Sequence, residues 1–177
     1  MQVQNVLKKA AGLDIRMICP LHGLIWRKDL NMILDKYQKW STYTPEENSV
    51  MIAYASIYGH TEQAADVLAA ELSKNGVKNI AVYDVSATDP SYIISDAFRY
   101  SHVVFASVTY NNGIFPQMET LLHEFVAHNL QNRTIALIQN GTWAPTAAKQ
   151  MMEILSGLKK NTMMEQQVTL KSAMKAE

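Results

Sequence analysis

The turn that joins an apolar run to an amphipathic stretch constrains the fold of this chain most. The run Val50–Ala55 has no charged residue, the segment Ser56–Thr61 that follows is rich in hydroxyl groups, and helical spacing of apolar residues starts at Glu62. We therefore predict a buried strand, a turn and a helix in direct succession. The first backbone N–H groups of a helix have no partner inside it and bind anions well. With the hydroxyl groups of Ser56 and Thr61 beside them, these donors predict a phosphate socket.

The same alternation of strand and helix continues along the chain. The strand candidates are Val50–Ala55, Ile80–Val85, His102–Ser107, Thr134–Gln139 and Met163–Leu170. The helical patterns between them are Glu62–Lys74 with Gly76 as its C-terminal cap, Asp89-Pro90 to about Arg99, and two helices that start at Pro116 and Pro145. Strands that alternate with helices predict an α/β fold with a parallel sheet and helices on both faces.

Three loops follow predicted strands at their carboxyl ends, namely Ser56–Thr61, Ser107–Gly113 and Asn140–Trp143. Ligands of open parallel sheets bind at this edge. The socket contains no Lys or Arg, which disfavours a nucleoside triphosphate and favours the single phosphate of flavin mononucleotide (FMN). Backbone and side-chain amides suit the polar edge of a flavin ring, and the aromatic rings of Tyr110 and Trp143 are candidates to stack on it.

The cofactor-binding residues predicted in this way are Ser56, Ile57, Tyr58, Gly59, His60, Thr61, Ser107, Val108, Thr109, Tyr110, Asn111, Asn112, Gly113, Asn140, Gly141, Thr142 and Trp143. Two parts of this set have simpler explanations. The sequence Asn111-Asn112-Gly113 is also that of an ordinary turn. The alternative for Trp143 is a rim position, packed on the helix that follows.

Composition and charge limit the other classes of function. The 16 basic and 16 acidic residues balance, so nothing indicates a nucleic acid or a membrane surface as a partner. The single cysteine, Cys19, fits a reducing cytoplasm, and there is neither a membrane-spanning apolar run nor a signal-peptide core. His123 and His128 lie five residues apart, which turns them by about 140° around a helix, so they cannot share a metal ion. We expect a cytoplasmic protein without a metal site.

The first 48 residues differ from the rest. Val3–Ile18 predicts a short helix and a strand, Trp26–Trp40 an amphipathic helix, and Ser41–Ser49 a polar linker. This part is too small to form a core of its own. We therefore divide the chain into an appendage, residues 1–48, and an α/β domain, residues 49–177.

The motifs, taken together, resemble those of a known family. Tyr54-x-Ser56-x-Tyr58-Gly59-x-Thr61-Glu62 and Ser107-x-Thr109-Tyr110-Asn111-Asn112-Gly113-x-x-Pro116 resemble the flavodoxin-like domain of flavodiiron proteins, or A-type flavoproteins. The upstream run Cys19-Pro20-Leu21-His22-Gly23-Leu24-Ile25-Trp26-Arg27 resembles the end of that family's metallo-β-lactamase-like domain.

The resemblance implies a flavodoxin-like three-layer sandwich with a five-stranded parallel sheet in the order 2-1-3-4-5, and non-covalently bound FMN. It implies that Ser56–Thr61 hold the phosphate, that Thr109–Gly113 and Gly141–Trp143 hold the ring, and that His22 matches the last iron-ligand histidine. In that family a rubredoxin-like donor passes electrons through FMN to a di-iron site that reduces oxygen or nitric oxide. Its members pair head to tail, which implies a homodimer here.

The chain also departs from the family. The iron-ligand run H-x-E-x-D-H is missing, so residues 1–48 would be a remnant, and this chain alone is not expected to be active. Leu24 replaces the usual Pro, and Asn140–Trp143 differs from the usual Ser-x-Gly-Trp-type loop. Lys171–Glu177 is expected to begin a closing helix. A free-standing flavodoxin electron carrier and a flavin-free dimerisation module with the same fold are the alternatives.

Overall fold

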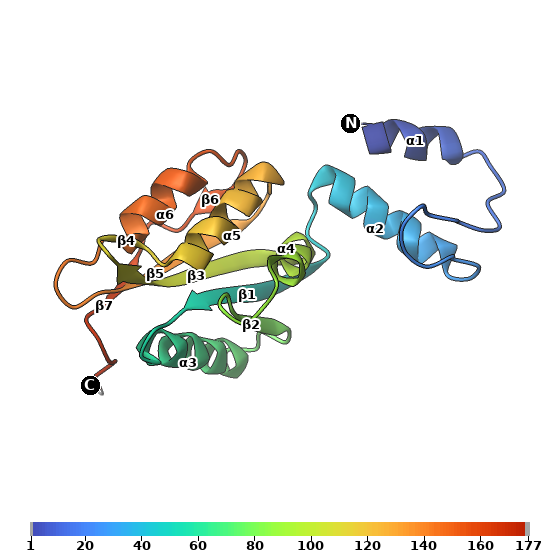
Figure 1. The fold of residues 1–177 in the computed structure, drawn as a ribbon. Helices are drawn as coiled ribbons and strands as arrows, with labels where there is room; N and C mark the ends of the chain where they lie inside the picture. The colour runs from blue at the N-terminus through green and yellow to red at the C-terminus, as the bar shows by residue number, and fades with distance from the viewer. Residues whose placement is uncertain (1, 176–177) are drawn as a thin grey trace.

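The computed structural model describes residues 2–175, in which a mainly parallel sheet lies between two layers of helices (Figure 1). The strands are β1 (Glu47–Ala55), β2 (Ile80–Asp84), β3 (Tyr100–Tyr110), β4 (Gly113–Ile114), β5 (Thr134–Asn140), β6 (Thr162–Met163) and β7 (Val168–Leu170). The helices are α1 (Gln2–Ala10), α2 (Leu30–Thr42), α3 (His60–Lys74), α4 (Pro90–Arg99), α5 (Pro116–Ala127) and α6 (Ala147–Leu155). The α/β fold class predicted from the sequence is confirmed.

The sheet has the order β2-β1-β3-β5-β6, which agrees with the predicted 2-1-3-4-5, but it contains seven strands rather than five. One reason is that the predicted fifth strand is divided into β6 and β7, both parallel to β5. The exposed polar residues Glu165–Gln167 separate the two pieces. The other reason is β4, a short antiparallel strand that pairs with the end of β3.

The local signals for helix ends are confirmed in three places. The carboxylate of Asp89 accepts a hydrogen bond from the N–H of Ser91 at 2.9 Å, and Pro90 is the first residue of α4. Pro116 is the first residue of α5. Gly76 follows α3 with φ +90°, the left-handed conformation expected of a glycine at this place.

Several predicted boundaries are wrong. The linker predicted at Ser41–Ser49 is shorter, because α2 runs to Thr42 and β1 starts at Glu47 rather than Val50. β3 runs three residues past Ser107, because its end pairs with β4. α2 starts at Leu30 rather than Trp26, after Asp29 in a left-handed conformation. α6 starts at Ala147 rather than Pro145.

Two elements predicted at the ends of the chain are also wrong. The strand predicted within Val3–Ile18 is reduced to a single bridge between Ile18 and Trp26. Lys171–Lys175 form no helix, and the last residues of the closing helix predicted there, 176–177, lie outside the described residues. In the described residues up to 48, Ile33 is the only buried side chain, and the main contacts of α1 are with α2.

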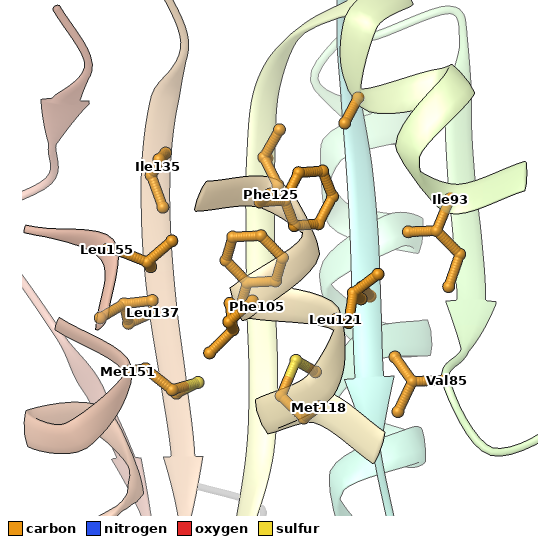
Figure 2. Close-up of a cluster of buried hydrophobic side chains, with 14 of the residues drawn as sticks. Val85, Ile93, Phe105, Met118, Leu121, Phe125, Ile135, Leu137, Met151 and Leu155 are labelled. Carbon is orange, nitrogen blue, oxygen red and sulfur yellow. The ribbon is translucent and has the colours of Figure 1, made fainter. Parts of the chain in front are cut away.

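The main core lies between the sheet and the helices α4, α5 and α6. Figure 2 shows side chains from both layers meeting there, among them Phe105 of β3 and Phe125 of α5, whose ring centroids are 5.3 Å apart. Met118, Leu121 and Met151 in the same cluster are almost completely buried. Each such side chain contributes about 1.5–3 kcal/mol of hydrophobic free energy.

The opposite face of the sheet is covered by α3 (Figure 1). Beside this helix an apolar groove of about 260 Å³ stays open. Leu68 and Leu72 of α3 line one side of it, and Val104 and Ile138 lie at its floor in the sheet. Among residues 2–175, no helix combines the length and the apolarity needed to cross a lipid bilayer.

Arg133, which precedes β5, is the largest fully buried side chain and is only 2% exposed. Its guanidinium donates to the carbonyl oxygens of Ala97 (2.8 Å) and Phe98 (2.6 Å) at the end of α4. It also donates to Tyr43 O (2.8 Å), just after α2, and to Gln131 O (2.7 Å). Burial lowers the pKa of Arg133 to about 10. One side chain therefore joins α2, α4 and β5 at the amino edge of the sheet.

We predict that Arg133→Lys lowers the free energy of unfolding by about 3 kcal/mol, because one ammonium group cannot replace donors aimed at four separate carbonyls. Urea denaturation measures this loss. Arg16→Lys is the matched control, since the side chain of Arg16 is 87% exposed, and it should change stability by less than about 0.5 kcal/mol. Equal effects of the two substitutions would contradict the role given to Arg133.

Candidate functional site

The parallel register brings the ends of four strands to one level. Ala55 pairs with Ser107, Val108 with Asn140, and Asn140 with Leu170. The segments that follow these strands enclose a pocket of about 370 Å³, within the usual range of ligand sites. The lining residues are Ser56, Ile57, Tyr58, His60, Thr61, Val108, Thr109, Asn140, Gly141, Thr142, Trp143 and Ser172.

The first loop presents the bare N-terminus of α3 to this pocket. Gly59 precedes the helix at φ +84°, and no side chain in the described part of the chain caps it. Its own N–H donates to Ser56 Oγ at 3.1 Å, which fixes the turn. The first N–H groups of the helix, those of His60 and Thr61 among them, have no helical partner. These neutral donors and the positive end of the helix dipole suit an anion.

The second loop contributes less than the sequence predicts. Ser107 is fully buried, and its hydroxyl donates to Val108 O at 3.0 Å instead of facing the pocket. Asn111 and Asn112 have φ values of +48° and +60° and form the two-residue turn between β3 and β4. The ordinary-turn explanation therefore describes the backbone at these two asparagines.

The predicted site residues that do not line the pocket are Gly59, Ser107, Tyr110, Asn111, Asn112 and Gly113. Tyr110 is 42% exposed, and its ring packs edge to face against Phe115, with centroids 6.1 Å apart. Gly59 belongs to the turn that leads into α3, although it does not itself line the pocket.

The third loop is held close to the second. Thr109 Oγ1 accepts hydrogen bonds from the N–H groups of Thr146 (3.2 Å) and Ala147 (3.4 Å), at the start of α6. A Cβ at position 141 would lie only 3.0 Å from Pro145 Cα and 3.1 Å from Thr109 Oγ1, so this close approach requires Gly141. Trp143 is 97% exposed, which excludes the alternative in which it packs on the following helix.

Asn140 is buried, with 4% of its surface exposed, and its carboxamide is used within the protein. Nδ2 donates to Ser172 O at 3.1 Å, and Oδ1 accepts from the N–H of Ser172 at 2.9 Å. Sequence reasoning missed Ser172 as a lining residue. Nothing in the segment Lys171–Lys175 marks a ligand site, and a helix was expected there.

Tyr54 lies in β1 just before the first loop and is 9% exposed. Its hydroxyl donates to Glu62 Oε1 at 3.3 Å. Burial, with the nearby carboxylate of Glu62, raises the pKa of Tyr54 to about 12. Within residues 2–175, no group of three or more His, Cys, Asp or Glu side chains is arranged to hold a metal ion.

The raised pKa of Tyr54 predicts a loss of stability at high pH. The folded protein keeps the phenol proton up to about pH 12, whereas the ordinary phenol loses it near 10.0. The stabilisation that the protonated phenol gives the folded state is complete below pH 10 and is lost as the pH rises to 12. The free energy of unfolding falls by at most about 2–3 kcal/mol over this range. Urea unfolding across this pH range should show a smaller fall in the free energy of unfolding for Tyr54→Phe than for the unmodified protein. Tyr58→Phe, at an 85% exposed position, should behave like the unmodified protein.

Comparison with known proteins gives one family match. The family model described as Flavodoxin matches residues 52–175. An uncharacterised protein of Methanocaldococcus jannaschii is 28% identical over 178 residues, covering 100% of this chain and 44% of its own length. A nitric oxide reductase of Moorella thermoacetica is 30% identical over 148 residues, covering 84% of this chain and 37% of its own.

The structural comparisons agree. Rubredoxin oxygen:oxidoreductase of Desulfovibrio gigas superposes with a TM-score of 0.86 at 26% identity, over 98% of this chain and 44% of that protein. The flavodiiron protein of Giardia intestinalis shares the fold, with a TM-score of 0.89 at 22% identity over 98% of this chain and 43% of its own. The chain therefore spans less than half the length of these proteins.

Proposed function

The chain belongs to the flavodoxin family, and we propose that it is the electron-carrying FMN domain of a flavodiiron-type oxygen or nitric oxide reductase. FMN is the cofactor of this flavodoxin-like domain. The observation that carries the proposal is the uncapped N-terminus of α3, which opens into a pocket without Lys or Arg. Such a pocket suits one phosphate held by neutral donors.

The lining residues divide into two groups that fit the two ends of FMN. The N–H groups of His60 and Thr61, with the hydroxyl of Thr61, would hold the phosphate. Backbone groups of Thr109 and Gly141–Thr142 would bind the polar edge of the ring, and the exposed indole of Trp143 is free to stack on its face. Bound FMN supplies one- and two-electron redox chemistry, while the protein orients the ring and adjusts its potentials.

The activity proposed for the longer protein is taken from the names of two relatives. The Desulfovibrio gigas protein is named for rubredoxin and oxygen, and the Moorella thermoacetica protein for nitric oxide. We propose a rubredoxin-like donor, a di-iron acceptor site outside this chain, a homodimer and a cytoplasmic location.

The proposed division of the chain at residue 48 has separate support. Residues 1–48 would be a remnant of a metallo-β-lactamase-like domain, in which His22 matches an iron ligand. The side chains of Leu21, Leu24 and Ile25 in this segment are 97%, 79% and 54% exposed, as expected of a surface that binds another part of a protein. The residues after 48 contain all the lining residues of the pocket.

The first test is reconstitution. Purified protein that is mixed with FMN and desalted should keep the flavin absorption bands at about one FMN per chain, and dithionite should bleach them without releasing the flavin. A protein that stays colourless would rule out the electron carrier and leave the flavin-free dimerisation module. Sedimentation of the same sample as a monomer at high concentration would remove the homodimer.

A second test uses two glycines with the same conformation. Gly59 (φ +84°) starts α3 at the pocket, and Gly76 (φ +90°) follows its far end, and a Cβ at either meets no atom within 4 Å. Valine at either site should cost stability through backbone strain, of order 1–3 kcal/mol. Only Gly59→Val should also lower FMN affinity, tenfold or more, or about 1.4 kcal/mol. Equal affinities of the two variants for FMN would show that the phosphate binds elsewhere.

A further inference from the structure

The turn after β7 forms a fourth wall of the pocket, which the three predicted loops do not include. Ser172 lines the pocket together with residues of the first loop, although it lies 112 positions from His60 in the chain. Pairing of β7 with β5 brings it there, since Leu170 is the register partner of Asn140. The N–H of Gly141 donates to Leu170 O at 3.0 Å and strengthens the same connection.

Asn140 fixes the backbone of Ser172. Both backbone groups of Ser172 bond to the Asn140 carboxamide, at 2.9 and 3.1 Å. Ser172 has φ +74°, a conformation that residues other than glycine adopt at a cost and keep only where their surroundings impose it. Because its N–H and C=O are both taken by Asn140, the Ser172 hydroxyl remains for another partner.

That hydroxyl lies 3.3 Å from Nδ1 of His60, the first residue of α3. If Nδ1 carries the proton, it donates to Ser172 Oγ, and the Ser172 O–H is free to donate. If Nε2 carries the proton instead, Ser172 donates to Nδ1 and the Nε2–H is free. In either tautomer the pair keeps one donor free for a ligand.

We propose that Ser172 and His60 act as a pair that binds the phosphate of FMN, with Asn140 as the positioning residue that holds Ser172 in place. The inference rests on the proposed function, because it takes FMN as the occupant of the pocket. No Lys or Arg lines this pocket, so an extra neutral donor at its phosphate end adds substantially to binding.

Ser172→Ala and Ser172→Gly test the pair together. Both remove the hydroxyl, but glycine adopts φ +74° freely and alanine does not. Both variants should bind FMN about tenfold more weakly than the unmodified protein. Their affinity for riboflavin, which lacks the phosphate, should not change. The ³¹P resonance of bound FMN should shift in both variants, while the visible absorption of the flavin ring stays the same.

Three outcomes would overturn the inference. FMN affinity within twofold of the unmodified protein in both variants would show that the hydroxyl does not contribute. A loss in Ser172→Ala that is absent in Ser172→Gly would show that FMN binding does not need the hydroxyl. Equal losses for FMN and riboflavin would mean that Ser172 shapes the pocket as a whole. If the unmodified protein binds no FMN, the proposed function fails and this inference fails with it.

Asn140→Ala tests the positioning role in a double-mutant cycle. Alone, it should weaken FMN binding about as much as Ser172→Gly does. Combined with Ser172→Gly it should add less than a further twofold, because both substitutions remove the same phosphate contact. Additive losses would show that Asn140 acts on FMN by another route than Ser172.

Discussion

The parallel register of β1, β3, β5 and β7 is the constraint on which the pocket depends, because it brings the ends of these strands to one level. β1 is buried on both faces from Ser49 to Ala55, so its apolar residues alone do not distinguish one register from the next. At the amino edge, Arg99 forms an ion pair with Glu47 at 2.7 Å, and Arg133 binds the end of α4. Polar contacts at this edge therefore join β1, α4 and the start of β5, at the end of the sheet opposite the pocket.

Local signals predicted the parts of this structure that depend on neighbouring residues. The apolar run before Ser56 predicted β1 and its turn, and Asp89-Pro90 predicted the start of α4. The errors arise where contacts with residues far along the chain determine the local structure. The buried hydroxyl of Ser107 accepts from the N–H of Phe115, eight positions later, and the bonds between Asn140 and Ser172 join residues 32 positions apart. No pattern within a single loop contains that information, so the fourth wall could not be predicted.

The two ends of the pocket differ in how far their side chains are exposed. At the phosphate end, Thr61 is 1% and Asn140 4% exposed, and both belong to regular secondary structure. At the other end, Trp143 is 97% exposed. A cofactor held firmly by one end and open at the other can exchange electrons with a partner protein without leaving its site. The side chains that would contact the ring have few protein neighbours to limit their motion.

The partly covered face beside α3 affects how the protein behaves at high concentration. Its groove places Leu68, Leu72 and Val168 next to water, while the net charge of the chain is zero and its isoelectric point is about 7.0. Molecules without net charge do not repel one another, and an exposed apolar surface favours their association. Colloidal stability should therefore be poorest at neutral pH and improve on either side of it, as ionisation restores repulsion between the molecules.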